Sequence, residues 1–358
     1  MTAGRIQGTV RVVGAGLIGT SIGLALSKLG VEVSLEDASP ANVRLACDYG
    51  AGKPATGADQ PSLIVVCVPP DVTARVVVAE LKAYPKAIVT DVASVKSSIL
   101  DEIAATESDL SRYVGSHPMA GREKGGASSG RADIFMGRPW VISDHATSSA
   151  VASKLVEDLA LDLQSTPIRM SAIEHDRAVA LVSHVPQLVS SLLASRLIGA
   201  SGVELAGQGL RDTVRIAASD PKLWVQILGA NSAEVVSILD EYSNELNKVI
   251  AALRDVSKAG SLSTIDQTIA NGNLGVEQIP GKHGSRNSQF NAYVVMIDDQ
   301  PGELARLLTE IGEIGINVED LKLEHSPGAP IGLVELQVLP AVGEKLTKDL
   351  TERGWRFA

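Results

Sequence analysis

A glycine-rich segment at residues 115–126 carries side chains suited to proton transfer. Its histidine, His117, has an imidazole that accepts or releases a proton near neutral pH. The same segment holds two basic side chains and the carboxylate of Glu123. It follows a predicted strand, and loops at that end of an open α/β sheet bind ligands and place catalytic groups. We therefore interpret the segment as an acid–base loop with His117 as its proton acceptor.

Three further segments contain side chains that can bind or position a substrate. Ser94 follows a predicted strand and precedes a helix, so it either caps that helix or bonds a substrate hydroxyl. His184 lies near the helix-disrupting Pro186 and is either part of the site or a buried structural histidine. Arg211 and Arg215 would share one helix face, where they either bind carboxylates or pair with neighbouring aspartates. A substrate with a hydroxyl and a carboxylate fits this set.

A second glycine-rich motif, Gly-Ala-Gly-Leu-Ile-Gly, begins at Gly14 between a β-branched run and a helical pattern. Gly14 allows a tight turn, Gly16 lets the backbone approach a pyrophosphate, and Gly19 lets helix and strand pack closely. The first N–H groups of the helix, near Leu17 and Ile18, would bind the pyrophosphate, which the helix dipole also favours. The motif predicts a dinucleotide site.

Asp37 ends the second predicted strand, about 20 residues past the glycines, where an acid binds the adenosine ribose 2′-hydroxyl. A carboxylate there repels a 2′-phosphate, so we expect NAD rather than NADP. The adjacent Glu36 is the alternative. Val68 and Pro69 end another predicted strand and would form a wall of the cofactor cleft. Together with His117, these residues predict a nicotinamide enzyme with its own proton acceptor.

Composition limits the alternatives. The net charge of −10 gives no basic footprint for nucleic acid or an anionic membrane. The two cysteines have no metal-site spacing and form no disulfide framework, so we expect no metal. No signal-peptide core or apolar run of transmembrane length is recognised, and we expect a cytoplasmic protein.

The chain of 358 residues divides into regions of different pattern. Strands and helices alternate up to residue 170, which predicts a parallel, doubly wound α/β sheet. Strands are expected at 10–13, 31–35, 63–68, 87–91, 113–115 and 138–142, and helices beginning near residues 18, 40, 72, 96 and 148.

An all-helical domain is expected at 171–275, with wide apolar faces that suit a homodimer core. A Gly, Asn, Ser and Lys-rich stretch beginning at 271 is typical of a linker, which we place at 276–290. Residues 291–358 then predict a small βαββαβ domain.

In order and spacing, the motifs resemble the prephenate dehydrogenase family, also called the TyrA family. The resemblance covers about residues 9 to 260. It consists of the glycine motif at 14–19, Asp-x-x-Ser-x-Lys at 91–96, His-Pro-Met-Ala-Gly-x-Glu-x-Gly at 117–125, Ser-His-x-Pro at 183–186, Arg-Asp-x-x-Arg-Ile-Ala at 211–217, Asp-Pro at 220–221 and Trp224.

The resemblance implies NAD-dependent oxidative decarboxylation of prephenate to 4-hydroxyphenylpyruvate in tyrosine biosynthesis. His117 would take the proton of the ring 4-hydroxyl, and Ser94 would bond that hydroxyl or orient His117. Arg215 would bind a substrate carboxylate, His184 would help to place the substrate side chain, and Glu123 would line or support the pocket. Aromatisation drives the loss of CO2, so no metal is implied.

Residues 292 to 358 resemble an ACT domain, a small ligand-sensing module. The resemblance rests on Asp-Asp-Gln-Pro-Gly-Glu-Leu at 298–304 and Gly-Ile-Asn-Val at 315–318. It implies feedback control by an aromatic amino acid, with Asp299, Gly302 and Asn317 at the effector site.

Three alternatives remain open. The first is an arogenate or 4-amino-4-deoxyprephenate dehydrogenase of the same family, whose substrate carries a side-chain amine or a ring amine that prephenate lacks. The second is a non-catalytic NAD-binding amino-acid sensor, although such a protein would not need His117, Ser94 and Arg215 together. The third is a β-hydroxyacid dehydrogenase, which would place a catalytic lysine beside a glycine-rich turn of the helical domain, and no such lysine is present.

Overall fold

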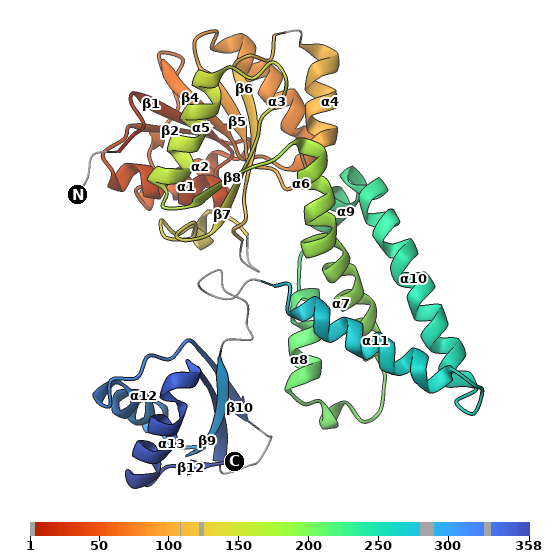
Figure 1. The fold of residues 1–358 in the computed structure, drawn as a ribbon. Helices are drawn as coiled ribbons and strands as arrows, with labels where there is room; N and C mark the ends of the chain where they lie inside the picture. The colour runs from red at the N-terminus through yellow and green to blue at the C-terminus, as the bar shows by residue number, and fades with distance from the viewer. Residues whose placement is uncertain (1–3, 108, 122–124, 280–289, 326–330) are drawn as a thin grey trace. The chain divides into compact units, whose positions relative to one another are not determined.

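The computed structural model describes residues 4–107, 109–121, 125–279, 290–325 and 331–358 (Figure 1). These residues form two compact units, and each is described by itself. The first unit runs up to residue 200 and takes in 213–241, and the second consists of 201–212 and 242–358.

An eight-stranded sheet forms the centre of the first unit (Figure 1). Its strands are β1 (Thr9–Val13), β2 (Val33–Glu36), β3 (Lys53–Pro54), β4 (Pro61–Val66), β5 (Ile88–Asp91), β6 (Tyr113–Pro118), β7 (Pro139–Ser143) and β8 (Thr166–Arg169). They are ordered β3-β2-β1-β4-β5-β6-β7-β8. The first six follow the order of a dinucleotide-binding Rossmann fold, in which ligands bind beyond the carboxyl ends of the central strands. The expected α/β domain is therefore confirmed.

Strand β7 departs from the expected all-parallel sheet, because it runs antiparallel to β6. The described part of the β6–β7 connection contains the 3-10 turn Ala127–Ser129 and no crossover helix. Parallel neighbours are usually joined through such a helix, as β7 and β8 are joined through α5 (Ala150–Asp162). Strands β3 and β8 were missed by the sequence prediction, since both are short and each contains a proline.

Helices cover both faces of this sheet. Helices α1 (Leu17–Lys28), α2 (Pro40–Asp48) and α5 pack on one face, and α3 (Pro70–Ala83) and α4 (Ser97–Thr106) pack on the other. Strands β1 and β4 are buried almost throughout, as expected where helices cover a parallel sheet on both sides. All five helices begin within two residues of the predicted starts.

The region after residue 170 is helical, as expected. Its elements are α6 (Ala172–Val179), the π turn Ala180–His184, α7 (Val185–Ser195), α8 (Gln208–Val214), the 3-10 turn Arg215–Ala217, α9 (Pro221–Ala230), α10 (Ser232–Arg254) and α11 (Ser261–Val276). Helix α11 extends through the first residues of the Gly- and Asn-rich stretch beginning at 271, so these residues are helical. Most of the linker predicted at 276–290 lies outside the described residues.

The continuous helical run Ala172–Ser195 differs from the expectation that no apolar run reaches transmembrane length. With 24 residues and a mean hydropathy of 1.4, it is long and apolar enough to cross a membrane. However, His175, Asp176 and His184 are buried within it and bonded to other elements of the first unit. Such polar contacts are those of a helix packed in a globular unit.

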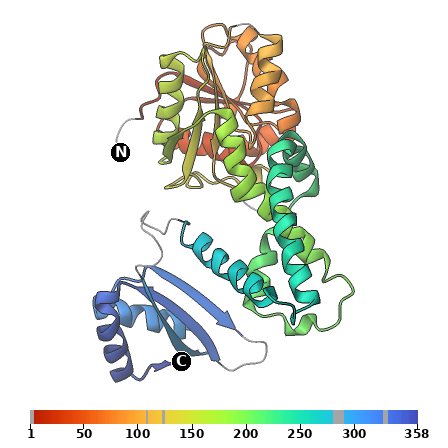
Figure 2. The ribbon, with the colours of Figure 1, turned by 45° about the vertical axis from the view of Figure 1, so that its right-hand side comes forward.

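The C-terminal part of the second unit has the predicted βαββαβ order. It consists of β9 (Asn291–Asp298), α12 (Glu303–Glu313), β10 (Asp320–His325), β11 (Ile331–Val338), α13 (Gly343–Glu352) and β12 (Arg356–Phe357). The four strands form an antiparallel sheet in the order β10-β11-β9-β12. Figure 2 shows α12 and α13, in blue, on one face of this sheet. Burial alternates along β11, so one face packs against these helices.

Candidate active site

The turn between β1 and α1 has the geometry of a dinucleotide-binding loop. Gly14 adopts a left-handed φ of +107°, and a Cβ there would overlap the carbonyl oxygen of Cys67. A Cβ on Gly19 would overlap the carbonyl oxygen of Gly14. By contrast, a Cβ on Gly16 would meet nothing within 4 Å, because the space above this residue is open. Gly14 and Gly19 therefore allow the turn to pack, while Gly16 leaves room for a ligand.

Asp37 faces this loop. Its carboxylate accepts hydrogen bonds from the backbone N–H of Ala15 at 2.7 Å and of Ser39 at 2.7 Å. Glu36 instead forms an ion pair with Arg11. Of the two acids considered for the ribose, Asp37 is the one held beside the glycine turn.

The proposed wall of the cleft also lies beside this turn. The backbone N of Val68 is 3.1 Å from the Cβ position of Gly14. The Thr73 hydroxyl, in the first turn of α3, donates to the carbonyl oxygen of Pro69 at 2.9 Å. Three features together fit a dinucleotide: the open space at Gly16, the Asp37 carboxylate held by backbone N–H groups, and the wall at Val68 and Pro69.

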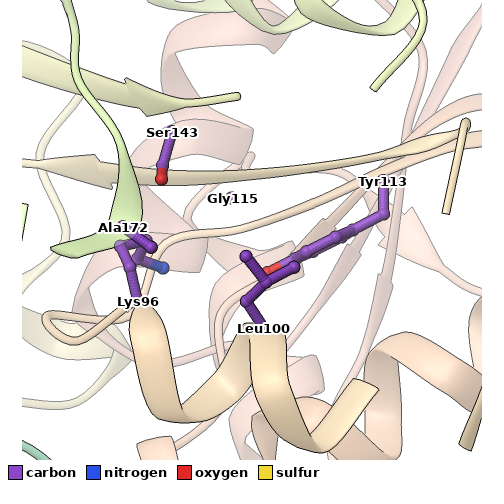
Figure 3. A pocket seen from close by; sticks show the side chains of 6 residues that line it. All are labelled: Lys96, Leu100, Tyr113, Gly115, Ser143 and Ala172. Atoms are coloured by element: carbon purple, nitrogen blue, oxygen red, sulfur yellow. The ribbon is translucent and has the colours of Figure 1, made fainter. Parts of the chain in front are cut away.

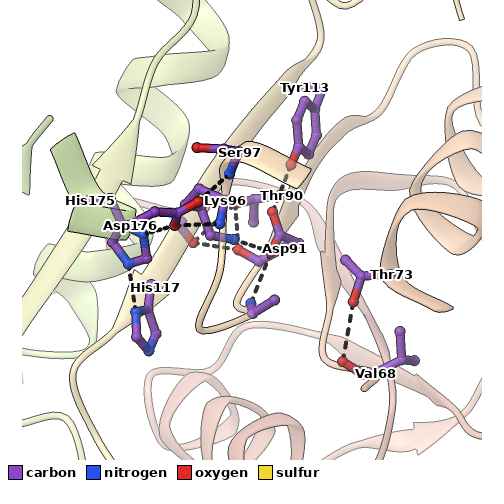
Figure 4. A network of polar contacts seen from close by, with 12 residues as sticks. Val68, Thr73, Thr90, Asp91, Lys96, Ser97, Tyr113, His117, His175 and Asp176 are labelled. Carbon is purple, nitrogen blue, oxygen red and sulfur yellow. Dashed lines mark hydrogen bonds and ion pairs between the residues drawn. The ribbon is translucent and has the colours of Figure 1, made fainter. Parts of the chain in front are cut away.

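His117 lies within β6, not in a loop after the strand as the sequence predicts, because the pairing of β6 with β7 extends to Pro118. Its side chain joins a series of polar contacts (Figure 4). Its Nδ1 is 2.8 Å from Nε2 of His175, which is fully buried in α6. On its other side, Nδ1 of His175 lies 2.7 Å from Oδ1 of Asp176. His117 itself is half-buried, and its Nε2 makes no hydrogen bond with the described residues. The arrangement leaves Nε2 available to a substrate.

The Asp176 carboxylate is fixed by the start of α4. It accepts the backbone N–H of Lys96 at 2.8 Å and that of Ser97 at 2.7 Å. Burial acts to raise the pKa of Asp176, but these bonds and the one to His175 outweigh it and hold the pKa below its ordinary value. Asp176 is therefore a fixed negative charge beneath His175.

Burial is the main cause that lowers the pKa of His117 well below its usual 6.5, and the neighbouring His175, Lys96 and His184 act in the same direction. A lowered pKa keeps the imidazole neutral at physiological pH. Because a neutral imidazole has one free lone pair, His117 is ready to accept a proton.

A buried ion pair supports the strands around His117. Lys96 bonds Asp91, whose other oxygen accepts the Tyr113 hydroxyl at 2.8 Å. A pocket bordered by Lys96 and Tyr113 is too small for a water molecule (Figure 3). We interpret this cluster as structural, because it joins β5, β6 and the start of α4 and offers no room for a ligand.

Ser94 does not cap the following helix, so that alternative is wrong. Helix α4 begins at Ser97, and its N-cap residue is Lys96, with no side-chain cap bond. The Ser94 side chain is half-buried and makes no hydrogen bond within the described part of the chain. Its hydroxyl is therefore available to a ligand.

His184 is 1% exposed, so the structure places it beneath the surface. The Asn231 side-chain amide lies 3.1 Å from Nδ1 of His184 and also donates to the carbonyl oxygen of Asp176 at 2.8 Å. Burial lowers the pKa of His184 to about 4. The ring of Trp224 packs edge-on against the imidazole, with 6.1 Å between the two ring centres. His184 is joined through Asn231 to the same network as His117.

Arg211 and Arg215 do not share a helix, since α8 ends at Val214 and Arg215 begins a 3-10 turn. Arg211 belongs to the second unit and Arg215 to the first. Arg215 is exposed and makes no ion pair with the described residues. The two aspartates considered as partners of the arginines make other hydrogen bonds. Asp220 caps α9, and Asp212 accepts from the side chain of Gln208. The guanidinium of Arg215 is therefore available to an anion.

The loop that carries Arg215 is tied to α7. Gln187, which is buried, donates to the Ser219 hydroxyl at 2.7 Å, and Ser219 follows the 3-10 turn.

Glu123 lies outside the described residues. No group of three or more His, Cys, Asp or Glu side chains that could hold a metal occurs among the residues described.

The predicted effector residues lie in the C-terminal domain. Asp299 is exposed in the turn after β9, and Gly302, with φ of +97°, is the N-cap residue of α12. The side-chain amide of Asn317 donates to Glu319 at 2.8 Å.

Sequence reasoning missed His175, Asp176 and Asn231. The adjacent pair His175-Asp176 in an apolar helical pattern was the available signal. A capping box between Ser171 and Glu174 marks the start of this helix in the sequence. Only the packing of α6 against α4 brings the pair to His117.

Comparison with known proteins agrees with this geometry. Residues 22–166 match the family model described as prephenate dehydrogenase, nucleotide-binding domain, and 171–265 match its dimerization domain. The probable prephenate dehydrogenase NovF of Streptomyces niveus is 35% identical over 97% of this chain and 98% of its own length.

Solved structures show the same fold. A putative prephenate dehydrogenase from Corynebacterium glutamicum aligns at 28% identity with a TM-score of 0.67, over 75% of this chain and 87% of that one. The prephenate dehydrogenase of A. aeolicus, solved with hydroxyphenyl propionate and NAD+, has a TM-score of 0.67 at 24% identity, over 75% of this chain and 98% of that one. From its extended similarity to NovF and its match to both domain models, the chain belongs to the prephenate dehydrogenase family.

Proposed function

We propose that this protein catalyses the NAD-dependent oxidative decarboxylation of prephenate to 4-hydroxyphenylpyruvate, a step of tyrosine biosynthesis. The observation that carries the proposal is the half-buried His117, whose free Nε2 belongs to a neutral imidazole in the dinucleotide-binding domain. Prephenate has the hydroxyl and carboxylates that this site requires. The names of the family relatives supply the substrate class.

In the proposed reaction, Nε2 of His117 takes the proton of the ring 4-hydroxyl as hydride leaves C4. When bound, the nicotinamide ring of NAD supplies the hydride acceptor. The ring carboxylate then leaves as CO2, and its bonding electrons remain in the ring, which becomes aromatic. His117 returns the proton to the phenolate oxygen. A positioned general base of this kind contributes about 10²–10⁴-fold in rate.

Other residues of the chain would bind and orient the substrate. The free Ser94 hydroxyl would bond the 4-hydroxyl group. The guanidinium of Arg215, which has no ion-pair partner in the described part of the chain, would bind a substrate carboxylate with two parallel hydrogen bonds. His184 would act through Asn231 on the position of α6, since its ring is buried. The carboxylate of Asp37 would bond the adenosine ribose and select NAD over NADP.

The decisive experiment follows NADH formation with prephenate, arogenate and 4-amino-4-deoxyprephenate in parallel. We expect prephenate to give the highest kcat/KM, and NAD to exceed NADP. Equal or greater turnover of arogenate or of the amino analogue would reassign the substrate. NAD binding with no turnover of any of the three would favour a cofactor-binding sensor.

For the C-terminal domain we propose an ACT module that binds an aromatic amino acid. The βαββαβ order, the four-stranded antiparallel sheet and the turn at Gly302 support this assignment. Calorimetry with tyrosine and phenylalanine tests it, using Asp299→Ala and Asn317→Ala as variants. Binding that neither variant weakens would place the effector elsewhere.

We also propose a cytoplasmic homodimer formed by the helical region. Large apolar side chains lie exposed on α7, α10 and α11, and a second copy would cover them. They are Leu192, Leu193, Val236, Leu246, Leu253, Leu262 and Ile269. Sedimentation analysis of the full chain tests this proposal, and a monomer at micromolar concentration would contradict it.

A further inference from the structure

We propose that His175 and Asp176 form a positioning relay that holds His117 as the tautomer protonated on Nδ1, with Nε2 free to accept the substrate proton. Neither residue touches the substrate in this proposal. The inference rests on the proposed function for the role of His117, but the tautomer itself is a property of the protein alone.

The direction of the relay follows from its hydrogen bonds. An ionised carboxylate only accepts, so the Nδ1 of His175 that lies 2.7 Å from Asp176 must carry the hydrogen. In a neutral imidazole the other nitrogen is then an acceptor. The Nε2 of His175 therefore accepts from Nδ1 of His117 across 2.8 Å. This leaves the lone pair of the His117 ring on Nε2.

The backbone holds the carboxylate in place. Oδ1 of Asp176 accepts the N–H of Lys96, and Oδ2 accepts the N–H of Ser97. Rotation of the carboxylate would break both bonds, and burial leaves no water to replace them. The His175 side chain is fully buried, and its backbone N–H donates to the carbonyl oxygen of Ser171 at 2.9 Å at the start of α6.

The relay also compensates the charge that develops on His117. Once Nε2 takes a proton, the imidazolium still donates through Nδ1 to His175, whose far side bonds a fixed negative charge. Lys96, a cation close to His117 and Asp176, forms an ion pair with Asp91 and therefore does not neutralise Asp176. His184 is held by the Asn231 amide, outside the relay. Asp176 thus ends the series of hydrogen bonds that runs from His117 through His175, and its negative charge stabilises the imidazolium.

The test compares His175→Phe, which keeps a ring but removes both nitrogens, with His175→Gln, whose side-chain oxygen can still accept from His117. For His175→Phe we expect kcat to fall by about 10²-fold, the lower end of what a positioned general base contributes. The KM for prephenate and the Kd for NAD should stay within about threefold, because the relay does not contact either molecule. His175→Gln should recover a measurable part of kcat.

A matched control is His145→Phe. His145 also bonds the sheet, through the carbonyl oxygen of Tyr113 at 3.0 Å, but lies outside the relay. Its kcat should equal that of the wild type. A His175→Phe kcat within twofold of the control would overturn the proposal, as would no recovery in a folded His175→Gln.

Nitrogen-15 NMR of histidine-labelled protein reads the tautomer without substrate. The His117 resonances are assigned by their loss in His117→Asn. We expect a protonated Nδ1 and an unprotonated Nε2 in the wild type, and a mixture of tautomers in His175→Phe. A protonated Nε2 in wild type would refute the relay even if prephenate is turned over. The expected tautomer without turnover of prephenate would instead keep the relay and reject the proposed substrate.

Discussion

At the scale of single residues, the lone pair on Nε2 of His117 is the group on which the proposed chemistry depends. We predict that His117→Asn abolishes turnover, since an amide cannot accept a proton at neutral pH. NAD binding should be nearly unchanged, because the hydrogen bond of His117 is made to His175 in α6 and not to the glycine turn. Steady-state assays and cofactor titration measure the two quantities, and an unchanged kcat would reject the mechanism.

Arg215 is expected to act in binding rather than in chemistry. Its guanidinium has no ion-pair partner among the described residues, so an anionic substrate would supply one. We predict that Arg215→Ala raises the KM for prephenate by roughly tenfold or more, since a lost charged hydrogen bond costs about 1.5–3 kcal/mol. The melting temperature should stay unchanged for an exposed side chain. Arg177→Ala, which removes another exposed arginine from the first unit, is the control. A normal KM would make Arg215 structural.

The buried histidines make stability depend on pH. The pKa of His184 is about 4 in the folded protein, against about 6.5 for an unperturbed histidine. The unfolded chain therefore binds more protons between these values, and stability falls as pH decreases from about 6.5 to 4. We predict that the melting temperature drops through this window and that the drop is smaller in His184→Gln. Calorimetric scans at several pH values measure it, and parallel curves for the two proteins would contradict this origin.

Single residues also show what sequence can and cannot reveal. The sequence points to His117 as a candidate because a histidine beside a glycine-rich segment is a local signal, although the structure places it in β6 and not in a loop. His175 was not, because it lies 58 residues away and reaches His117 only through packing. Ser94 follows β5 as expected, but the prediction that it could cap the next helix is wrong, because α4 begins three residues later.

At the scale of elements, two glycines of the β1–α1 turn have different roles. Gly19 allows the turn to pack, whereas Gly16 leaves space for the cofactor. A methyl group on Gly19 overlaps the carbonyl oxygen of Gly14, whereas one on Gly16 enters open space. We predict that Gly19→Ala lowers the melting temperature markedly. Gly16→Ala should fold with a normal melting temperature but bind NAD more weakly, since its methyl occupies the space for the pyrophosphate. Thermal scans and NAD titration of the two variants test this, and equal NAD affinity in Gly16→Ala and wild type would contradict it.

The limits of prediction at this scale have physical causes. The alternation of strands and helices identified the doubly wound sheet, because buried parallel strands have distinctive apolar runs. It did not reveal that β7 is antiparallel, since direction depends on how the β6–β7 connection returns. The π turn that accommodates Pro186 was likewise not predictable, because the sequence indicates only that the regular helix is disturbed there.

At the scale of the whole molecule, the proposed chemistry and the proposed regulation belong to separate parts of the chain. His117 and its partners lie in the first unit, whereas the βαββαβ domain packs around a core drawn from its own residues. Because no described residue before position 291 belongs to that core, each part has its own hydrophobic stabilisation. The division predicts that catalysis and amino-acid response can be lost independently.

A chain ending at residue 279 tests this division. We predict that it keeps kcat/KM for prephenate within about fivefold of the full chain, because every described contact of His117, His175 and Asp176 is retained. It should lose the response to tyrosine or phenylalanine, if the full chain has one. The melting transition of the first unit, followed with NAD present, controls for folding. A folded but inactive truncated chain would show that the C-terminal domain is needed for catalysis, and retained inhibition by tyrosine would place the effector in the first unit's own active site.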